Sequence, residues 1–211
     1  MKTKLISPLV GLFLMSIGNS NAQNFKFDML AGFDVVNIHQ SALQPNATRP
    51  PFTSMMSYNV NCVISYKKHD RWGFSVEPGL IQKGALGGVQ LRSKIELKYF
   101  QMPTLANIYF LHKFFISIGP EFSFLIDSRY INPKSTIDAS SVYKKFELSG
   151  LIGINYMITK SFDFGLRYSR GLTYIMKMPL YGNSIYGNYW EVVGIAKQYN
   201  ECLQLTVSVT I

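Results

Sequence analysis

The sequence predicts an all-β fold, an eight-stranded antiparallel up-and-down transmembrane β-barrel. Three observations lead to it: an export signal, runs in which every second residue is apolar, and connections that alternate between short and long. The last run, ECLQLTVSVTI, shows the pattern, with apolar residues at Leu203, Leu205, Val207, Val209 and Ile211. Strict alternation indicates a strand whose two faces meet different surroundings.

The amino-terminal residues are typical of a secretory signal peptide. Two lysines open the segment, residues 5–17 form a short apolar core, and Ala22 is the small residue at the expected cleavage site. The core is shorter than the roughly 20 residues that a spanning helix needs, which makes a membrane anchor the weaker reading. We therefore expect a signal peptide at residues 1–22 and one barrel domain at residues 23–211.

Eight runs of alternating apolar residues predict the strands. In chain order they cover residues 25–37, 54–67, 72–83, 95–110, 113–125, 146–157, 162–174 and 199–211. Each run has the roughly 9–11 residues that a tilted strand needs to cross a bilayer. Three connections are short, and the four longer ones cover 38–53, 84–94, 127–145 and 175–198. Short and long connections alternate, as in a barrel with tight turns at its periplasmic end, where both termini would then lie.

Each predicted strand has one apolar face without charges. Along the chain, representative pairs on this face are Phe27 and Phe33, Tyr58 and Ile64, Phe74 and Leu80, Phe100 and Ile108, Ile116 and Phe122, Ile152 and Ile154, Phe164 and Leu166, and Leu203 and Leu205. A lipocalin-like soluble barrel would place these side chains inside, but an eight-stranded interior is too narrow for so many aromatic rings. The apolar face therefore points outward into lipid, where a Lys or Arg at the bilayer midplane would cost roughly 2–4 kcal/mol.

Two details follow from this arrangement. Aromatic residues flank the short turns, for example Tyr66 and Trp72 around the first, which predicts an interfacial girdle on the periplasmic side. Pro78, Pro103 and Pro120 lie within predicted strands, where each removes a hydrogen-bond donor, and we expect local bulges there.

The opposite face is small and polar and carries charged side chains that need partners in the interior. The predicted interior network consists of Lys26, Glu77, Lys83, Glu121, Asp163 and Arg167, with Asp28, Asp34 and Glu147 on the same face. Arg167 can fork onto a carboxylate such as Glu77 or Glu121. We interpret the network as a salt-bridged plug, because eight strands leave little lumen; a selectivity-lined channel is the alternative.

The long connections contain the candidate recognition residues. These are Arg129, Lys144, Lys145, Tyr186, Tyr189 and Trp190. Exposed Tyr and Trp favour binding of lipid A phosphates, a partner protein or a host ligand, whereas solvated loop caps are the alternative. The formal net charge of +9 favours anionic lipid and lipopolysaccharide as partners over nucleic acid.

Several kinds of site are not expected. His39, His69 and His112 are spread over both ends of the predicted barrel, so they predict no shared metal site, and no motif predicts a cofactor. No histidine lies with a serine and an acid on the lipid-facing wall, so we expect no enzymatic activity. Cys62 and Cys202 fall on strands that are not expected to be neighbours, which predicts two inert thiols, with a disulfide as the alternative.

Several stretches resemble the PorT-like outer-membrane proteins of Bacteroidota, which are OmpA/OmpX-type eight-stranded barrels. They are the leader ending NAQ, GFSVEPGLIQKGA, and ELKYFQMPTLANIYF followed by FFISIGPEFSFLI, and the family's Y-L-x-I-P strand corresponds to residues 99–103. The resemblance implies an outer-membrane location in a Gram-negative bacterium, insertion by the barrel-assembly machinery and a link to type IX-like secretion. It implies no catalytic residue.

Together these features predict an outer-membrane barrel with a structural or interaction role that binds through its extracellular loops. A small porin-like channel for small solutes is the alternative, supported by the polar interior. A lipid-modifying enzyme is a third hypothesis, with no supporting motif.

Overall fold

The computed structural model describes residues 25–41, 52–69, 71–87, 93–111, 113–183 and 190–211. Almost all of these residues are in β-strands. Within these ranges no helix combines the length and the apolar character required to span a membrane. The predicted signal peptide, residues 1–22, lies outside the described part of the chain.

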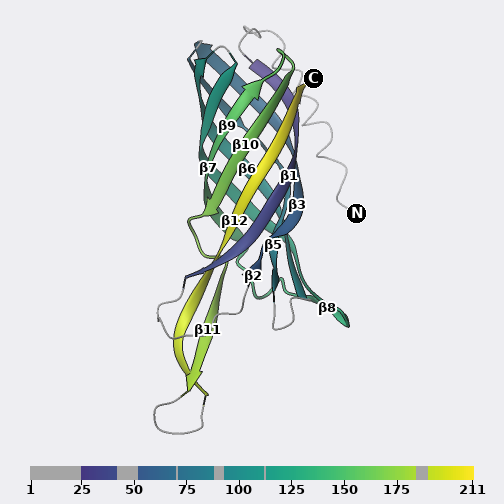
Figure 1. The fold of residues 1–211 in the computed structure, drawn as a ribbon, viewed down its shortest axis with the longest axis vertical. Helices are drawn as coiled ribbons and strands as arrows, with labels where there is room; N and C mark the ends of the chain where they lie inside the picture. Colours follow the sequence, from purple (N-terminus) through teal and green to yellow (C-terminus); the bar gives the residue numbers. More distant parts are fainter. Residues whose placement is uncertain (1–24, 42–51, 70, 88–92, 112, 184–189) are drawn as a thin grey trace, which may run out of the picture.

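The predicted all-β, eight-stranded antiparallel arrangement is confirmed (Figure 1). The ring consists of β1 (Phe25–Ser41), β3 (Met55–His69), β4 (Trp72–Val76) in line with β5 (Gly79–Gly87), β6 (Ser93–Leu111), β7 (Phe114–Asn132), β9 (Phe146–Met157), β10 (Phe162–Gly171) and β12 (Trp190–Thr210). Pairing of β1 with β12 closes it, with Asp34 opposite Gln204. The start of β1, the end of β12 and the three short turns all lie at one end of the ring.

At the other end the strands run further than the sequence predicted. β7 continues to Asn132 and turns back as β8 (Ser135–Asp138), while β5 pairs with the short β2 (Phe52–Thr53). β11 (Met176–Asn183) pairs with β12 in a hairpin that projects beyond the ring (Figure 1). Much of the predicted loops 127–145 and 175–198 is therefore strand. The sequence missed these hairpins because apolar alternation, the signal that identified the strands, fades where strands leave the lipid.

The expected bulges at the prolines are wrong. Val76 is opposite Thr104 and Gly79 is opposite Gln101, so the register runs unchanged past Pro78. Proline lacks the N–H donor but keeps its acceptor, and the carbonyl of Pro78 accepts a hydrogen bond from the Cys62 N–H at 2.9 Å. The register shifts lie elsewhere. Those in the β6–β7 pair fall between Lys98 and Tyr99 and between Tyr109 and Leu111, and the one in the β3–β4 pair falls between Lys67 and His69.

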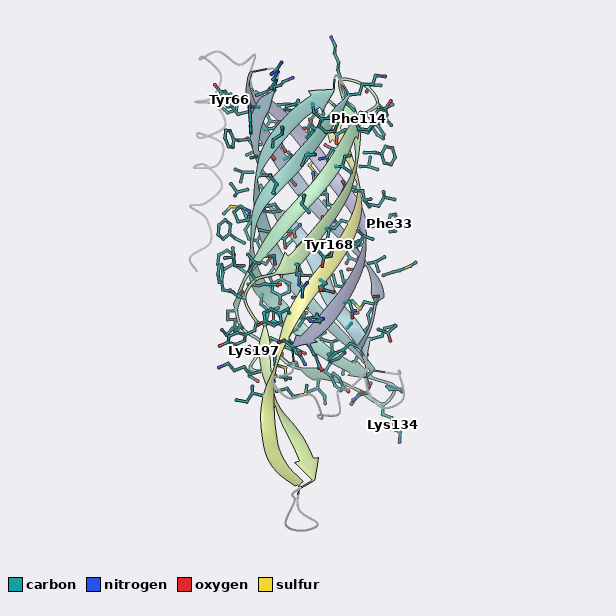
Figure 2. All side chains as sticks on the ribbon, turned by 60° about the vertical axis from the view of Figure 1, so that its left-hand side comes forward. Phe33, Tyr66, Phe114, Lys134, Tyr168 and Lys197 are labelled. Carbon is teal, nitrogen blue, oxygen red and sulfur yellow. The ribbon has the colours of Figure 1, made fainter. Side chains whose placement is uncertain are left out.

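The apolar face points outward, as the sequence predicts. Phe33 is 79 % exposed on the outer wall, and Figure 2 shows it, with Tyr168, projecting from the side of the ring. Aromatic rings pack against one another at the short-turn end, including Phe114 with Tyr156 at 4.8 Å between ring centroids. These aromatic residues lie beside the short turns, where the sequence predicts a girdle.

The inner face is not polar along its whole length, which the sequence did not predict. A buried apolar cluster occupies the lumen at the end away from the short turns, and it includes Val36, Ile38, Leu97, Tyr99, Tyr143 and Ile175. Tyr143 comes from the connection between β8 and β9, outside every predicted strand. The inside of the ring is therefore polar toward the short-turn end and apolar toward the opposite end.

Candidate functional site

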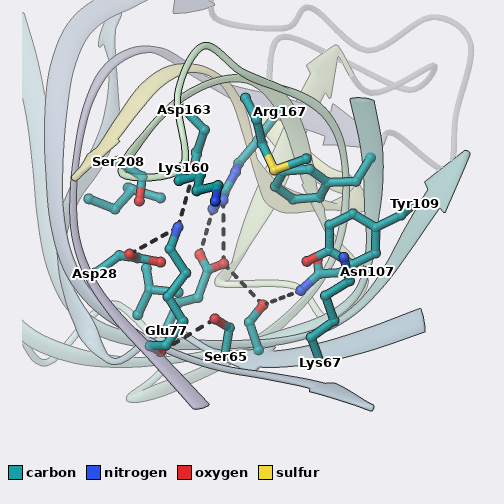
Figure 3. Close-up of a pocket in the computed structure, with 16 residues that line it drawn as sticks. Asp28, Ser65, Lys67, Glu77, Asn107, Tyr109, Lys160, Asp163, Arg167 and Ser208 are labelled. Atoms are coloured by element: carbon teal, nitrogen blue, oxygen red, sulfur yellow. Dashed lines mark hydrogen bonds and ion pairs between the residues drawn. The ribbon is translucent and has the colours of Figure 1, made fainter. Parts of the chain in front are cut away.

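The lumen opens at the short-turn end into a vestibule of about 220 Å³ (Figure 3). Lys26 stands at its mouth, with its Nζ 3.1 Å from Asp28 Oδ1 and 3.9 Å from Asp163 Oδ2. Its side chain is 36 % exposed, whereas both carboxylates are largely buried. Screening by water makes these mouth contacts weaker than the deeper ion pairs.

Arg167 and Glu77 form the inner wall of the vestibule. Arg167 Nη1 donates to Glu77 Oε2 at 2.5 Å and Nη2 donates to Glu77 Oε1 at 3.3 Å. Both side chains are buried, so the fork is shielded from water. Of the two carboxylates that the sequence allowed, the structure therefore selects Glu77. Glu77 lies at the junction of β4 and β5, and Arg167 is on β10. These two strand positions are four places apart in the ring of eight, so the pair crosses the full width of the lumen.

A chain of hydrogen bonds from neutral side chains ends on Glu77. Asn155 donates to Ser117 Oγ at 2.9 Å, and Ser117 donates to Asn107 Oδ1 at 2.7 Å. Asn107 then donates to Ser75 Oγ at 3.1 Å, and Ser75 donates to Glu77 Oε1 at 3.3 Å. Every step donates toward Glu77, which satisfies the remaining lone pairs of a buried carboxylate. The sequence predicts a small, polar inner face but does not show which of its residues are connected.

Lys83 forms a second ionic cluster further along the lumen. Its Nζ lies 2.7 Å from Glu121 Oε1 and 3.5 Å from Glu147 Oε2, and all three side chains are at most 1 % exposed. Asn200 also donates to Glu147 Oε2, at 2.8 Å. Lys83 reaches from β5 to β7 and β9, so this cluster, like the Arg167 pair, links strands that are not neighbours in the ring. The six predicted interior residues thus fall into three separate groups rather than one network.

Basic side chains gather around Tyr174 at the end of the ring away from the short turns. The Nζ atoms of Lys144, Lys177 and Lys197 lie 3.4, 5.1 and 5.8 Å from the centroid of its ring. Lys177 is directly opposite Lys197 in the β11–β12 pair, an unfavourable placement for like charges. The hydrogen bond from Lys144, together with the lysine charges, lowers the pKa of the Tyr174 phenol. The lysines therefore create a strongly positive spot at this end.

The predicted recognition residues separate in the structure. Lys144 belongs to this lysine cluster and Lys145 is exposed beside it in the chain. Arg129 instead pairs with Asp127, at 3.0 Å from Nε to Oδ2. Tyr186 and Tyr189 lie outside the described residues, and Trp190 is described only as the first residue of β12. Lys177, Lys197 and Tyr174 were missed; the only signal was their basic and aromatic character within or beside the predicted loop 175–198.

Other potential sites are less prominent. In the described ranges, no three His, Cys, Asp or Glu side chains are grouped so that they could hold a metal ion. Cys62 is an exposed free thiol on the outer wall, and Cys202 is a buried one in the lumen. They are on strands β3 and β12, which are separated by β1.

A protein-family model described as outer membrane protein beta-barrel domain matches residues 21–177. Among solved structures, Neisserial surface protein A is similar at 14 % identity and a TM-score of 0.52, covering 88 % of this chain and 97 % of that one. Ail, the attachment invasion locus protein of Yersinia pestis, has 9 % identity and a TM-score of 0.47, covering 89 % and 99 %. OprG of Pseudomonas aeruginosa has 16 % identity and a TM-score of 0.46, covering 89 % and 96 %. No curated protein matches the chain.

Proposed function

Because the chain belongs to the family of outer membrane proteins with a β-barrel domain, we propose that it serves as a closed barrel with a structural or interaction role. It sits in the outer membrane of a Gram-negative bacterium, its lumen is plugged, and its extracellular end binds partners. The observation that carries this proposal is the filling of the lumen by the Arg167–Glu77 pair, the Lys83 cluster and the apolar cluster at the end away from the short turns.

The two ionic groups support a plug because of their geometry and burial. Each joins strand positions that are not neighbours in the ring, so each ties distant walls together. A conducting pore requires a continuous solvated path through the lumen. Here the deeper acids are engaged by cations, amides and hydroxyls, and apolar side chains follow them. The same engagement of the acids supports a non-enzymatic role.

The extracellular end supports binding to lipid, including lipopolysaccharide. On the outward face of β12, apolar residues such as Leu203 are followed by Glu201 and then by Lys197. This change fits a strand that passes from the acyl chains of the lipid to its headgroups. Lysines at this level attract phosphates, each contributing about 1 kcal/mol near an anionic surface. The lysine cluster around Tyr174 is thus suited to outer-leaflet phosphates.

A protein partner would contact the projecting hairpin of β11 and β12. In the described residues β11 pairs with β12 alone, so its other edge offers backbone groups for strand addition. The resemblance to PorT-like proteins of Bacteroidota supports a link to a secretion machine of type IX kind. Both termini would then face the periplasm, after insertion by the barrel-assembly machinery.

A small porin-like channel is the second candidate, favoured by the vestibule at the short-turn end. Electrical recording in planar lipid bilayers separates the two, using protein whose folding is verified by its shifted mobility on unheated SDS gels. We expect no conductance steps from the closed barrel. Steps of porin-like size from the folded wild-type protein would refute the plug and favour the channel.

A further inference from the structure

A second cavity, of about 350 Å³, lies toward the end of the ring away from the vestibule, where members of the apolar cluster form part of its lining. It is lined mainly by apolar side chains from several elements, among them Phe52, Ile95, Val142 and Met176. Its volume falls within the roughly 300–1,000 Å³ range of ligand pockets, and barrel mouths are a common place for them. It is more than twice the roughly 150 Å³ apolar cavity that binds benzene in an engineered protein.

One wall of this cavity carries an unpaired polar group. Gln198 lines the cavity, is 1 % exposed, and neither its Nε2 nor its Oε1 has a hydrogen-bond partner among the described residues. Gln40, directly opposite on β1, is buried with both amide atoms likewise unpartnered. Burying an amide without a partner is unfavourable, and such groups in native structures call for an explanation.

We propose that this cavity binds a small neutral amphiphile, whose apolar part fills the cavity and whose hydroxyl or amide head bonds to Gln198. An apolar lining with a few converging polar groups is the usual pattern of a small-molecule site. The head is neutral because, among the described residues that line the cavity, Asp138 is present and no Lys or Arg is, which disfavours a carboxylate. Met176 and Met178 in the lining provide flexible, polarizable side chains that adapt to such ligands.

The proposal is independent of the closed lumen. The cavity is separated from the vestibule by the apolar cluster and both ionic groups, so binding needs no passage through the barrel. The two proposals can therefore fail separately: the barrel can conduct and still have a ligand site, or it can be closed and have none. The bilayer recordings test the plug, and a ligand titration in nanodiscs tests the pocket.

The test is a titration of the whole protein in phosphatidylcholine nanodiscs, labelled with ¹³C at the methionine methyl groups. The probes are 1-octanol and octanoate at pH 8. We expect saturable shifts of the Met176 and Met178 methyl signals with octanol, and at least about tenfold weaker binding of octanoate. Met29, 40 % exposed on the lipid-facing wall, is the internal control and should show only the linear shift of partitioning into the bilayer.

Two substitutions locate the site. Gln198→Leu should weaken octanol binding by up to about tenfold, the size of one net hydrogen bond. Ile137→Trp, at an exposed lining position, should fill the cavity and abolish the saturable phase while the protein stays folded. Shifts at Met176 and Met178 that remain linear like those of Met29, or saturable shifts that survive Ile137→Trp, would overturn the proposal.

Discussion

Arg167 and Glu77 form a two-pronged ion pair across the lumen, although their strand positions lie on opposite sides of the ring. The arginine enters from β10 and the glutamate from the junction of β4 and β5, ninety residues apart in the chain. A fork of this kind sets the distance between two opposite walls as well as neutralising two buried charges.

Breaking this pair should strongly destabilise the barrel. Arg167→Ala leaves Glu77 buried without its cation, and we expect a loss of about 3–5 kcal/mol in the free energy of unfolding. Urea titration in detergent micelles, followed by tryptophan fluorescence, measures it. Arg170→Ala is the matched control, because Arg170 meets Glu201 at 3.4 Å on the exposed wall of the same strand and should cost less than about 1 kcal/mol. Equal losses in both variants would argue against a buried, shielded pair.

Gly153 should prove necessary for the position of Arg167. A Cβ added at Gly153 would lie 2.7 Å from Arg167 Cγ and 3.2 Å from the Leu166 carbonyl oxygen. We expect Gly153→Ala to destabilise the protein by about 1–3 kcal/mol, as overpacking does. On the same strand, a Cβ at Gly150 would meet only Leu172 Cδ1, at 3.9 Å, so Gly150→Ala should be nearly neutral. If the two alanine variants unfold at the same urea concentration, the steric argument fails.

Removing the Arg167 pair alone should not open a pore. In the proposed plug, the Lys83 cluster and the apolar cluster are further barriers beyond it. We therefore expect Arg167→Ala to remain electrically silent in planar bilayers under conditions in which it stays folded. Conductance steps in this single variant would show that the lumen has one barrier rather than three.

The lysine cluster should respond to lipid phosphate. Lys177→Gln removes one of two like charges that face each other, so it should stabilise the barrel in neutral phosphatidylcholine bilayers by a few tenths of a kcal/mol. In bilayers containing lipopolysaccharide the wild type should gain stability that the variant lacks, about 1 kcal/mol, and added salt should reduce the gain. Lys134→Gln, an exposed residue in the β7–β8 connection, is the control (Figure 2). If lipopolysaccharide stabilises Lys177→Gln as much as the wild type, the lysine cluster is not the phosphate site.

Tyr174 should ionise at a lower pH than an ordinary tyrosine. Lys144 lowers its pKa below the usual 10.0, so the ionised phenol is favoured in the folded state. The resulting stabilisation is present above the unfolded pKa and is lost as the pH falls through the folded pKa, so it is absent at neutral pH. The difference between the ultraviolet titration curves of the wild type and of Tyr174→Phe measures this pKa. Lys144→Met should raise it toward 10.0, and an unchanged value would contradict the assigned contact.

The sequence predicted the strands most accurately where lipid imposes alternation. Residues 146–157, predicted as one strand, are β9 with the same bounds. Predictions failed at the end away from the short turns, where β7 extends to Asn132 and the β11–β12 hairpin replaces a predicted loop. Outside the bilayer no apolar face is required, and hairpins there leave only weak traces in the sequence.

The sequence by itself determined which face of each strand meets lipid. Side chains alternate between the two faces of a strand, so each residue lies on the same face as the residues two places before and after it. It also determined that Lys83 and Arg167 would be surrounded by acids in a narrow interior. Only the tertiary structure decided that Arg167 takes Glu77, that Lys83 takes Glu121 and Glu147, and that apolar residues cap the lumen. Those choices depend on stagger and closure of the ring, which bring together side chains from distant segments, and no local pattern records them.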